Sequence, residues 1–123
     1  METQMRDAAT IANEYIALWN ETDPKRRAEA LAAGWEGNAT YVDPMMRGSG
    51  TGEIDGLIGG VHAQFPGFRF KLINQPNGFG EFVRFSWGLG PADGGAPIED
   101  SDVVVMRGER ISQVIGFLDK VPQ

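Results

Sequence analysis

The chain has 123 residues, a formal net charge of −6, no cysteine and a single histidine, His62. This length predicts one domain spanning residues 1–123, and the acidic charge argues against nucleic acid, whose phosphates bind positively charged surfaces. The composition also excludes disulfides, cysteine nucleophiles and multi-histidine metal sites. No apolar run is long enough to cross a membrane and the N-terminus does not resemble a signal peptide, so we expect a cytoplasmic protein without a membrane partner.

The first helix is expected from about Met5 to Asn20. Apolar side chains recur there at helical spacing, which is typical of one buried helix face. Tyr15 and Trp19 are four residues apart and therefore share that face. The whole predicted stripe is Ala8, Ala12, Tyr15, Ile16 and Trp19.

A second helix is expected from Asp23-Pro24 to about Ala33. Asp is a favourable N-cap, Pro is favourable at the first helical position, and Gly34 is a favourable stop. The buried side chains predicted for this segment are Ala28, Leu31, Ala32 and Trp35.

The stretch from Ala39 to Pro44 predicts a short strand that ends on a carboxylate, Asp43, and is stopped by the proline. Alternation puts Tyr41 and Asp43 on one face, and the aromatic ring makes that face the inner one. A carboxylate on an inner face is costly unless it is paired, hydrogen-bonded or protonated, so Asp43 serves either structure or acid–base chemistry. The structural alternative is a turn in which Asp43 caps its own backbone.

A loop over residues 47–52 leads into a third helix, for which Thr51 is the expected N-cap. Its apolar side chains repeat at helical spacing from Ile54 to Phe65, and Pro66-Gly67 ends it.

From Phe68 onward the apolar period changes to two, which predicts strands. The predicted inner face of the longest strand is Val83, Phe85, Trp87 and Leu89, with Arg84 and Ser86 between them. Two further strands are expected from about Asp102 to Arg107 and from Ile111 to Leu118, joined by a hairpin at Gly108-Glu109. This order predicts an α+β protein with helices on one face of an antiparallel sheet.

The order of elements resembles the nuclear transport factor 2-like superfamily, and within it the SnoaL-like polyketide cyclases and ketosteroid isomerases. The segments that carry the resemblance are Asn13–Asn20, Ala39–Pro44, Pro97–Met106, Gly108–Ile111 and Val114–Asp119. The resemblance covers nearly the whole chain. It implies a cone-shaped, curved antiparallel sheet with the three helices packed on its concave face, as in cystatin-like folds.

The resemblance also implies roles for three side chains. Asp43 matches the position of the ketosteroid isomerase general base, Tyr15 that of a hydroxyl donor, and Asp102 lies near that of a second, protonated carboxyl. It implies a small apolar carbonyl compound as ligand, and neither a cofactor nor a metal. The expected ligand pocket is lined by Trp19, Met46, Phe65, Phe85, Trp87 and Leu118.

Two of these side chains have structural alternatives. Tyr15 fits the helix core equally well, with its hydroxyl on a buried carbonyl. Asp102 follows the acidic stretch Glu99-Asp100-Ser101, which as an exposed loop would leave Asp102 solvated or capping that loop.

The leading hypothesis is therefore an acid–base enzyme of isomerase or cyclase type, in which Asp43 removes a proton and Tyr15 and Asp102 bind the developing enolate oxygen. The alternatives are a non-catalytic ligand-binding or interaction domain, and a domain whose pocket is filled by its own side chains. Family resemblance also implies a homodimer. The outer sheet face expected to form it carries Arg69, Lys71, Phe82 and Arg84.

Overall fold

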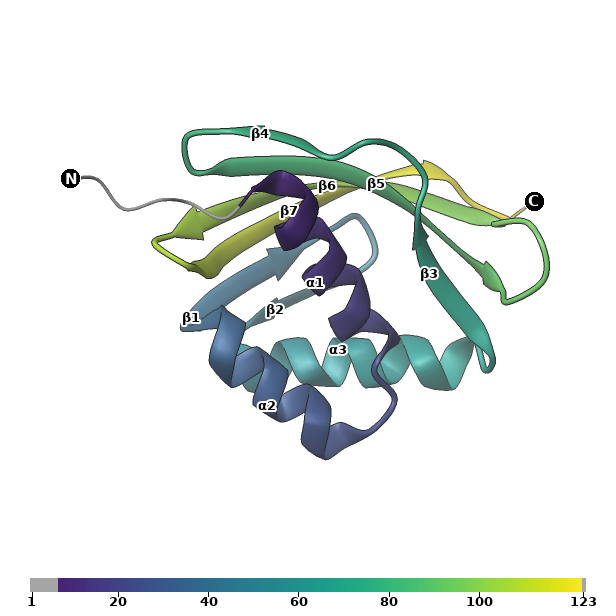
Figure 1. The fold of residues 1–123 in the computed structure, drawn as a ribbon. Coiled ribbons are helices and arrows are strands. Elements are labelled where there is room, and N and C mark those ends of the chain that lie inside the picture. The colour runs from purple at the N-terminus through teal and green to yellow at the C-terminus, as the bar shows by residue number, and fades with distance from the viewer. Residues whose placement is uncertain (1–6, 123) are drawn as a thin grey trace.

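Three helices come from the first half of the chain, and the long strands of the sheet come from the second half (Figure 1). The structure, a computed structural model, describes residues 7–122. The helices are α1 (Ala8–Asn20), α2 (Pro24–Gly34) and α3 (Thr51–Gln64). The strands are β1 (Trp35–Val42), β2 (Arg47–Ser49), β3 (Phe68–Leu72), β4 (Asn77–Phe79), β5 (Phe82–Pro91), β6 (Ile98–Arg107) and β7 (Arg110–Lys120).

The helix starts follow local capping chemistry. The carboxylate of Asp7 accepts a hydrogen bond of 2.8 Å from the backbone N–H of Thr10, and Asp23 with Pro24 begins α2 as predicted. Residue 5, where the first helix was expected to begin, lies outside the described residues. The expected cap at Thr51 is wrong: Gly50, with φ of 86°, is the N-cap of α3, and Thr51 is already helical.

The seven strands form one curved, unclosed sheet in the order β2-β1-β7-β6-β5-β3, and β4 pairs with β5 beside this path. The sheet is mixed rather than fully antiparallel, because β1 runs parallel to β7 while the other pairs are antiparallel. This parallel pair aligns Tyr41 with Val114 and Val42 with Ile115. It brings the end of β1 beside the middle of β7, which decides where Asp43 lies.

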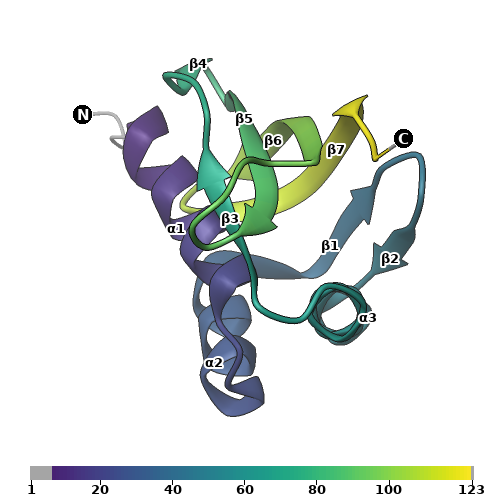
Figure 2. The same cartoon turned by 90° about the vertical axis from the view of Figure 1, so that its right-hand side faces the viewer.

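The inner face of β5 is the predicted one. Val83, Phe85, Trp87 and Leu89 are all buried, whereas Arg84 is exposed, so the register prediction is confirmed. Helix α1 covers this face and packs against β3 and β5, whereas α3 packs against β1 and β2 at the other end of the sheet (Figure 2).

The buried side of α2 differs from the predicted one. Ala28 and Ala32 are exposed, and Arg27 is buried in their place beside Leu31. The guanidinium of Arg27 donates hydrogen bonds to the carboxylate of Asp55 in α3 and to the backbone carbonyl of Glu21, at 3.0 Å for the latter. The ion pair with Asp55 offsets the cost of burying the Arg27 guanidinium, and it joins α2 to α3.

Candidate functional site

Three aspartates converge on the space above Gly116, a glycine in the middle of β7. Asp102 in β6 pairs directly with Gly116, and the parallel register of β1 carries Asp43 to its other side. A Cβ atom built on Gly116 would lie 2.6 Å from Oδ1 of Asp102, 3.3 Å from Oδ1 of Asp100 and 3.2 Å from Cβ of Asp43. The missing side chain therefore leaves the space that Asp43, Asp100 and Asp102, here named the aspartate cluster, share.

Asp102 is fully buried and is held by two donors from different elements. The hydroxyl of Tyr15 in α1 and the indole Nε1 of Trp87 in β5 both donate to Oδ2 of Asp102, at 2.7 and 2.9 Å. The resemblance predicted Tyr15 and Asp102 in one site, and the fold brings them into direct contact. The alternative of a solvated Asp102 is wrong, because the residue has no exposed surface.

Asp100 is a residue that the sequence-based site lacked. It was expected in an acidic loop, but β6 begins at Ile98, and Asp100 lies in the strand with its side chain fully buried. The signal was present in the period of two, since Asp100, Asp102 and Val104 occupy alternate positions. Among the described residues, no N–H or O–H group outside the Asp100–Asp102 pair itself donates to either oxygen of Asp100 or to Oδ1 of Asp102.

The side chain of Asp43 makes the turn cap that was weighed as its structural alternative. Its Oδ1 accepts from the backbone N–H groups of Met45 and Met46, at 2.7 and 2.9 Å, which is the expected turn cap before the next strand. Its Oδ2 accepts from the hydroxyl of Tyr41 at 2.6 Å, and the side chain is half-buried. Asp43 is therefore held in a fixed orientation at the more accessible edge of the aspartate cluster.

Burial changes the proton affinity of the cluster. Desolvation, reinforced by the nearby carboxyl of Asp102, raises the pKa of Asp100 to about 10. Desolvation also raises the pKa of Asp102, although hydrogen bonds from Asp100, Trp87 and Tyr15 oppose the shift. The pKa of the Tyr15 hydroxyl is raised well above its usual value, chiefly by burial, so Tyr15 remains a neutral donor. Both shifts favour the neutral form of a carboxyl in the Asp100–Asp102 pair.

The six side chains expected to line a ligand pocket differ in burial. Trp19, Phe85 and Trp87 are buried in the core around the aspartate cluster, where aromatic rings pack closely. The remaining three, Met46, Phe65 and Leu118, are half-buried. The indole Nε1 of Trp19 is buried without an acceptor among the described residues.

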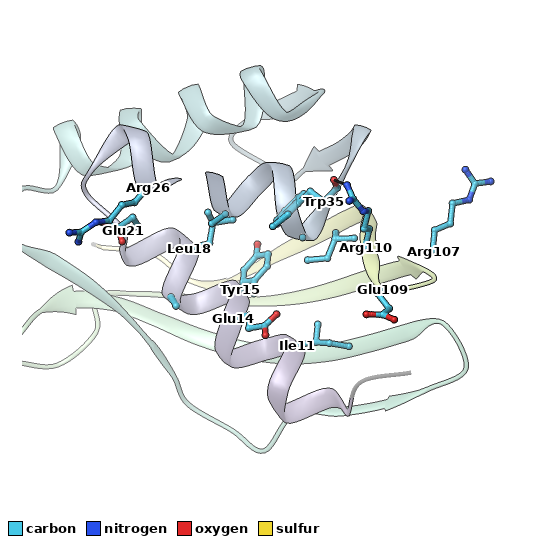
Figure 3. Close-up of a pocket in the computed structure, with 15 residues that line it drawn as sticks. Ile11, Glu14, Tyr15, Leu18, Glu21, Arg26, Trp35, Arg107, Glu109 and Arg110 are labelled. Atoms are coloured by element: carbon cyan, nitrogen blue, oxygen red, sulfur yellow. Dashed lines mark hydrogen bonds between the residues drawn. The ribbon is translucent and has the colours of Figure 1, made fainter. Parts of the chain in front are cut away.

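A groove of about 880 Å³ lies apart from the aspartate cluster, between α1, α2 and the β6–β7 hairpin (Figure 3). Leu18 and Trp35 contribute apolar wall, and Arg107 and Arg110 stand at its hairpin side. Tyr15 also lines this groove, whereas the three aspartates do not. Tyr15 thus separates the groove from the buried carboxyls.

His62 plays no part in the cluster. Its Nε2 lies 2.6 Å from the backbone carbonyl oxygen of Trp19, a geometry that requires the proton on Nε2. Its Nδ1 faces the guanidinium of Arg27 at 3.5 Å. The residue is half-buried in α3 and supports the helix packing.

The curved sheet and the three helices make a nuclear transport factor 2-like fold. A candidate isomerase of the SnoaL-like family from Agrobacterium tumefaciens is 44% identical, with a TM-score of 0.87 over 91% of this chain and 97% of that one. The chain belongs to the SnoaL-like family.

More distant structures share the fold alone. A candidate polyketide cyclase from Sinorhizobium meliloti is 14% identical, with a TM-score of 0.69 over 87% of this chain and 93% of that one. A protein with a ketosteroid isomerase-like fold from Catenulispora acidiphila, in complex with trimethylamine, is 22% identical, with a TM-score of 0.70 over 86% and 82%. No protein-family model and no curated protein matches the chain. None of the helices described for residues 7–122 is both long and apolar enough to cross a membrane.

Proposed function

We propose that this SnoaL-like protein binds a small apolar carbonyl compound at the aspartate cluster and moves a proton at the carbon beside the carbonyl. One observation carries the proposal: two aspartates without exposed surface occupy neighbouring inner-face positions of β6 inside an aromatic core. Buried carboxyls with unpartnered oxygens cost stability, so a fold that keeps them is expected to use them.

Asp43 is the proposed proton acceptor. It is more accessible than the other two aspartates, and its three hydrogen bonds fix its orientation without an ion pair. In the reaction, the electrons of the broken C–H bond form a carbon–carbon double bond, and the carbonyl oxygen becomes an enolate oxygen. In a β,γ-unsaturated ketone the enolate is conjugated with the second double bond, so return of the proton from Asp43 to the γ carbon shifts that double bond and gives the conjugated isomer, with no electrons leaving the substrate.

The enolate oxygen needs a hydrogen-bond donor in the same apolar surroundings, where donors act more strongly than in water. The neutral hydroxyl of Tyr15 and the proton of the Asp100–Asp102 pair are the proposed donors. Because Tyr15 already donates to Asp102, its hydroxyl must turn from that carboxylate toward the ligand. A ligand therefore needs side chains of the core to move, and this movement is proposed at the half-buried side, where Met46 and Leu118 lie.

The test is exchange of solvent deuterium into a panel of apolar ketones. The parent protein should catalyse exchange at the carbon beside the carbonyl, and Asp43→Asn should slow it by about 100-fold or more while keeping the fold. Asp93→Asn, in an exposed loop, is the matched control and should exchange like the parent. No exchange in the parent, or full exchange in Asp43→Asn, contradicts the proposed chemistry.

A second candidate function is binding without turnover. Tyr41 and Trp87 donate hydrogen bonds to Asp43 and Asp102, the ring of Trp19 packs on Tyr41, and rings beside carboxylates suit a small amine cation. The neighbour from Catenulispora acidiphila is in complex with trimethylamine. Calorimetric titration with trimethylammonium separates the two: saturable binding that weakens in Asp43→Asn, together with no ketone exchange, favours the binding protein.

We also propose a homodimer through the outer face of the sheet, with a second copy of this chain as the partner. This face is more apolar than expected, because register brings Val42, Ile115 and Val103 side by side across β1, β7 and β6. Phe117 and Phe82 extend it and are 57% and 42% exposed. A patch of this kind is typical of a protein–protein contact.

The cytoplasm is the proposed location. The chain has no cysteine, which is compatible with a reducing compartment where disulfides are not used. Fractionation of cells that produce the protein tests this directly.

A further inference from the structure

We propose that Asp100 is the protonated carboxyl of the aspartate cluster and the acid that meets the carbonyl oxygen of a ligand, while Asp102 is the carboxylate that orients Tyr15. The sequence-based interpretation gave the proton to Asp102 and no role to Asp100. The assignment of the proton to Asp100 does not depend on the proposed function. The role of Asp100 toward a ligand does rest on the proposed function.

The hydrogen-bond donors around Asp102 favour its ionised form. Oδ2 of Asp102 accepts two hydrogen bonds, from Tyr15 and from Trp87. Both acceptor positions of this oxygen are therefore used, and Oδ2 carries no proton. Both partners are N–H or O–H donors, and they favour a charged acceptor. Asp102 therefore has the surroundings of a carboxylate.

Asp100 has the opposite surroundings. Neither of its oxygens accepts a hydrogen bond from the described residues, although the side chain has no exposed surface. An ionised carboxylate at this position would lose its hydration without gaining a hydrogen bond or an ion pair to offset the cost. A proton on Asp100 removes this cost, and donation to the unpartnered Oδ1 of Asp102 completes the hydrogen bonding of the pair.

The charges that face Asp100 act in the same direction. Asp102 on the same strand, Asp43 at the end of β1 and Asp119 on β7 are the carboxyls that raise the pKa of Asp100. The remaining titratable neighbours of the pair, Tyr15 and Tyr41, have raised pKa values and stay neutral. Among the described residues, no lysine, arginine or histidine forms an ion pair with the aspartate cluster.

The strand register places Asp100 closer than Asp102 to the half-buried side of the aspartate cluster. Asp102 pairs with Phe85 on one side and Gly116 on the other, both buried. Asp100 lies one inner-face position further along β6, between Trp87 and the half-buried Leu118. A ligand that displaces Leu118 therefore reaches Asp100 before Asp102.

Infrared spectroscopy tests the protonation assignment without any ligand. At neutral pH the parent should show the carbonyl stretch of a neutral, buried carboxyl. Asp100→Asn should abolish this band, because an amide N–H can take over donation to Asp102, whereas Asp102→Asn should keep it. Asp43→Asn and the exposed-loop control Asp93→Asn should also keep the band.

Two results overturn the assignment: no neutral carboxyl band in the parent, or a band lost in Asp102→Asn and kept in Asp100→Asn. Circular dichroism checks that each variant folds. If Asp102→Asn fails to fold, assigned carboxyl ¹³C resonances of the parent replace it, and Asp100 should then be protonated at neutral pH while Asp102 is ionised. A reversed order of the two titrations also overturns the assignment.

Ketone exchange then tests the ligand-facing role. Asp100→Asn keeps an N–H donor and should retain more exchange than Asp100→Ala, by about tenfold, and Asp93→Asn should match the parent. Equal exchange in the two Asp100 variants contradicts the ligand-facing role. Absence of exchange in the parent contradicts the proposed function and this role, but leaves the infrared result on Asp100 unaffected.

Discussion

The hydroxyl of Tyr15 and the carboxylate of Asp102 are joined by a buried hydrogen bond of 2.7 Å, although 87 positions separate them in the chain. This contact connects the first helix to the centre of the sheet. It also explains why a carboxylate can remain in an aromatic core, since each donor to Asp102 replaces hydration that burial has removed.

Removing the Tyr15 donor tests the strength of this contact. Tyr15→Phe should lower the free energy of unfolding by about 1–3 kcal/mol, because Oδ2 of Asp102 loses one of two donors and water cannot replace it. Urea unfolding monitored by circular dichroism measures the change. Trp87→Phe should show a comparable loss, whereas a change below about 0.5 kcal/mol in Tyr15→Phe would mean that Asp102 needs no such partner.

Adding one methyl group at Gly116 should disrupt the aspartate cluster. The new Cβ would lie 2.6 Å from Oδ1 of Asp102, and that carboxyl cannot move aside without losing Tyr15 and Trp87. Gly116→Ala should therefore cost about 1–3 kcal/mol of unfolding free energy. The matched control is Gly60→Ala in α3, where a Cβ meets nothing within 4 Å and should stabilise the helix by about 0.5–1 kcal/mol. Equal effects of the two changes would refute the close approach.

The pH dependence of stability should reflect the proton on Asp100. Its pKa is about 10 in the fold against 3.8 for an ordinary aspartate, so between these values the native state binds more protons than the unfolded state. The stability contributed by Asp100 is then complete below pH 3.8 and is lost as the pH rises toward 10, by up to about 1.4 kcal/mol per pH unit. Urea unfolding from about pH 6 to about pH 9 should show a steeper decline for the parent than for Asp100→Asn. Parallel curves would contradict a native-state proton on Asp100.

The outer face of the sheet should mediate self-association. A dimer of this size buries about 800 Å² per partner, and a charge placed on its apolar face should prevent it. Phe117→Asp is expected to sediment as a monomer in analytical ultracentrifugation at micromolar concentration. Met45→Asp, at a residue 78% exposed in the turn after β1, is the control and should remain dimeric. A monomeric parent would contradict the proposal.

Local patterns were sufficient to predict much of the fold. Alternation predicts the inner face of β5, and Asp23 with Pro24 predicts the start of α2, because both depend on neighbouring residues only. The parallel pairing of β1 with β7 depends on contacts distant in the chain, and no local pattern encodes it. Arg27 was missed for a similar reason, since its partner Asp55 belongs to another helix.

The same difference between local patterns and contacts distant in the chain applies to the candidate site. Family resemblance predicted Asp43, Tyr15 and Asp102, and the structure joins Tyr15 to Asp102 directly. Asp100 was assigned to a loop because acidic residues flank it, and composition outweighed the period of two. Its proximity to the others becomes visible only when Gly116 provides the space between the strands.

The pairing of β1 with β7 also has a consequence for folding during synthesis. Asp43 leaves the ribosome early, but its neighbour Gly116 belongs to the last strand of the sheet to be made. Until β7 is available, β1 has no strand that joins it to β6, so Asp43 cannot reach its place beside Asp102. Contacts of such long sequence separation form slowly, so the nascent chain should keep its carboxyls hydrated until translation reaches the final strand.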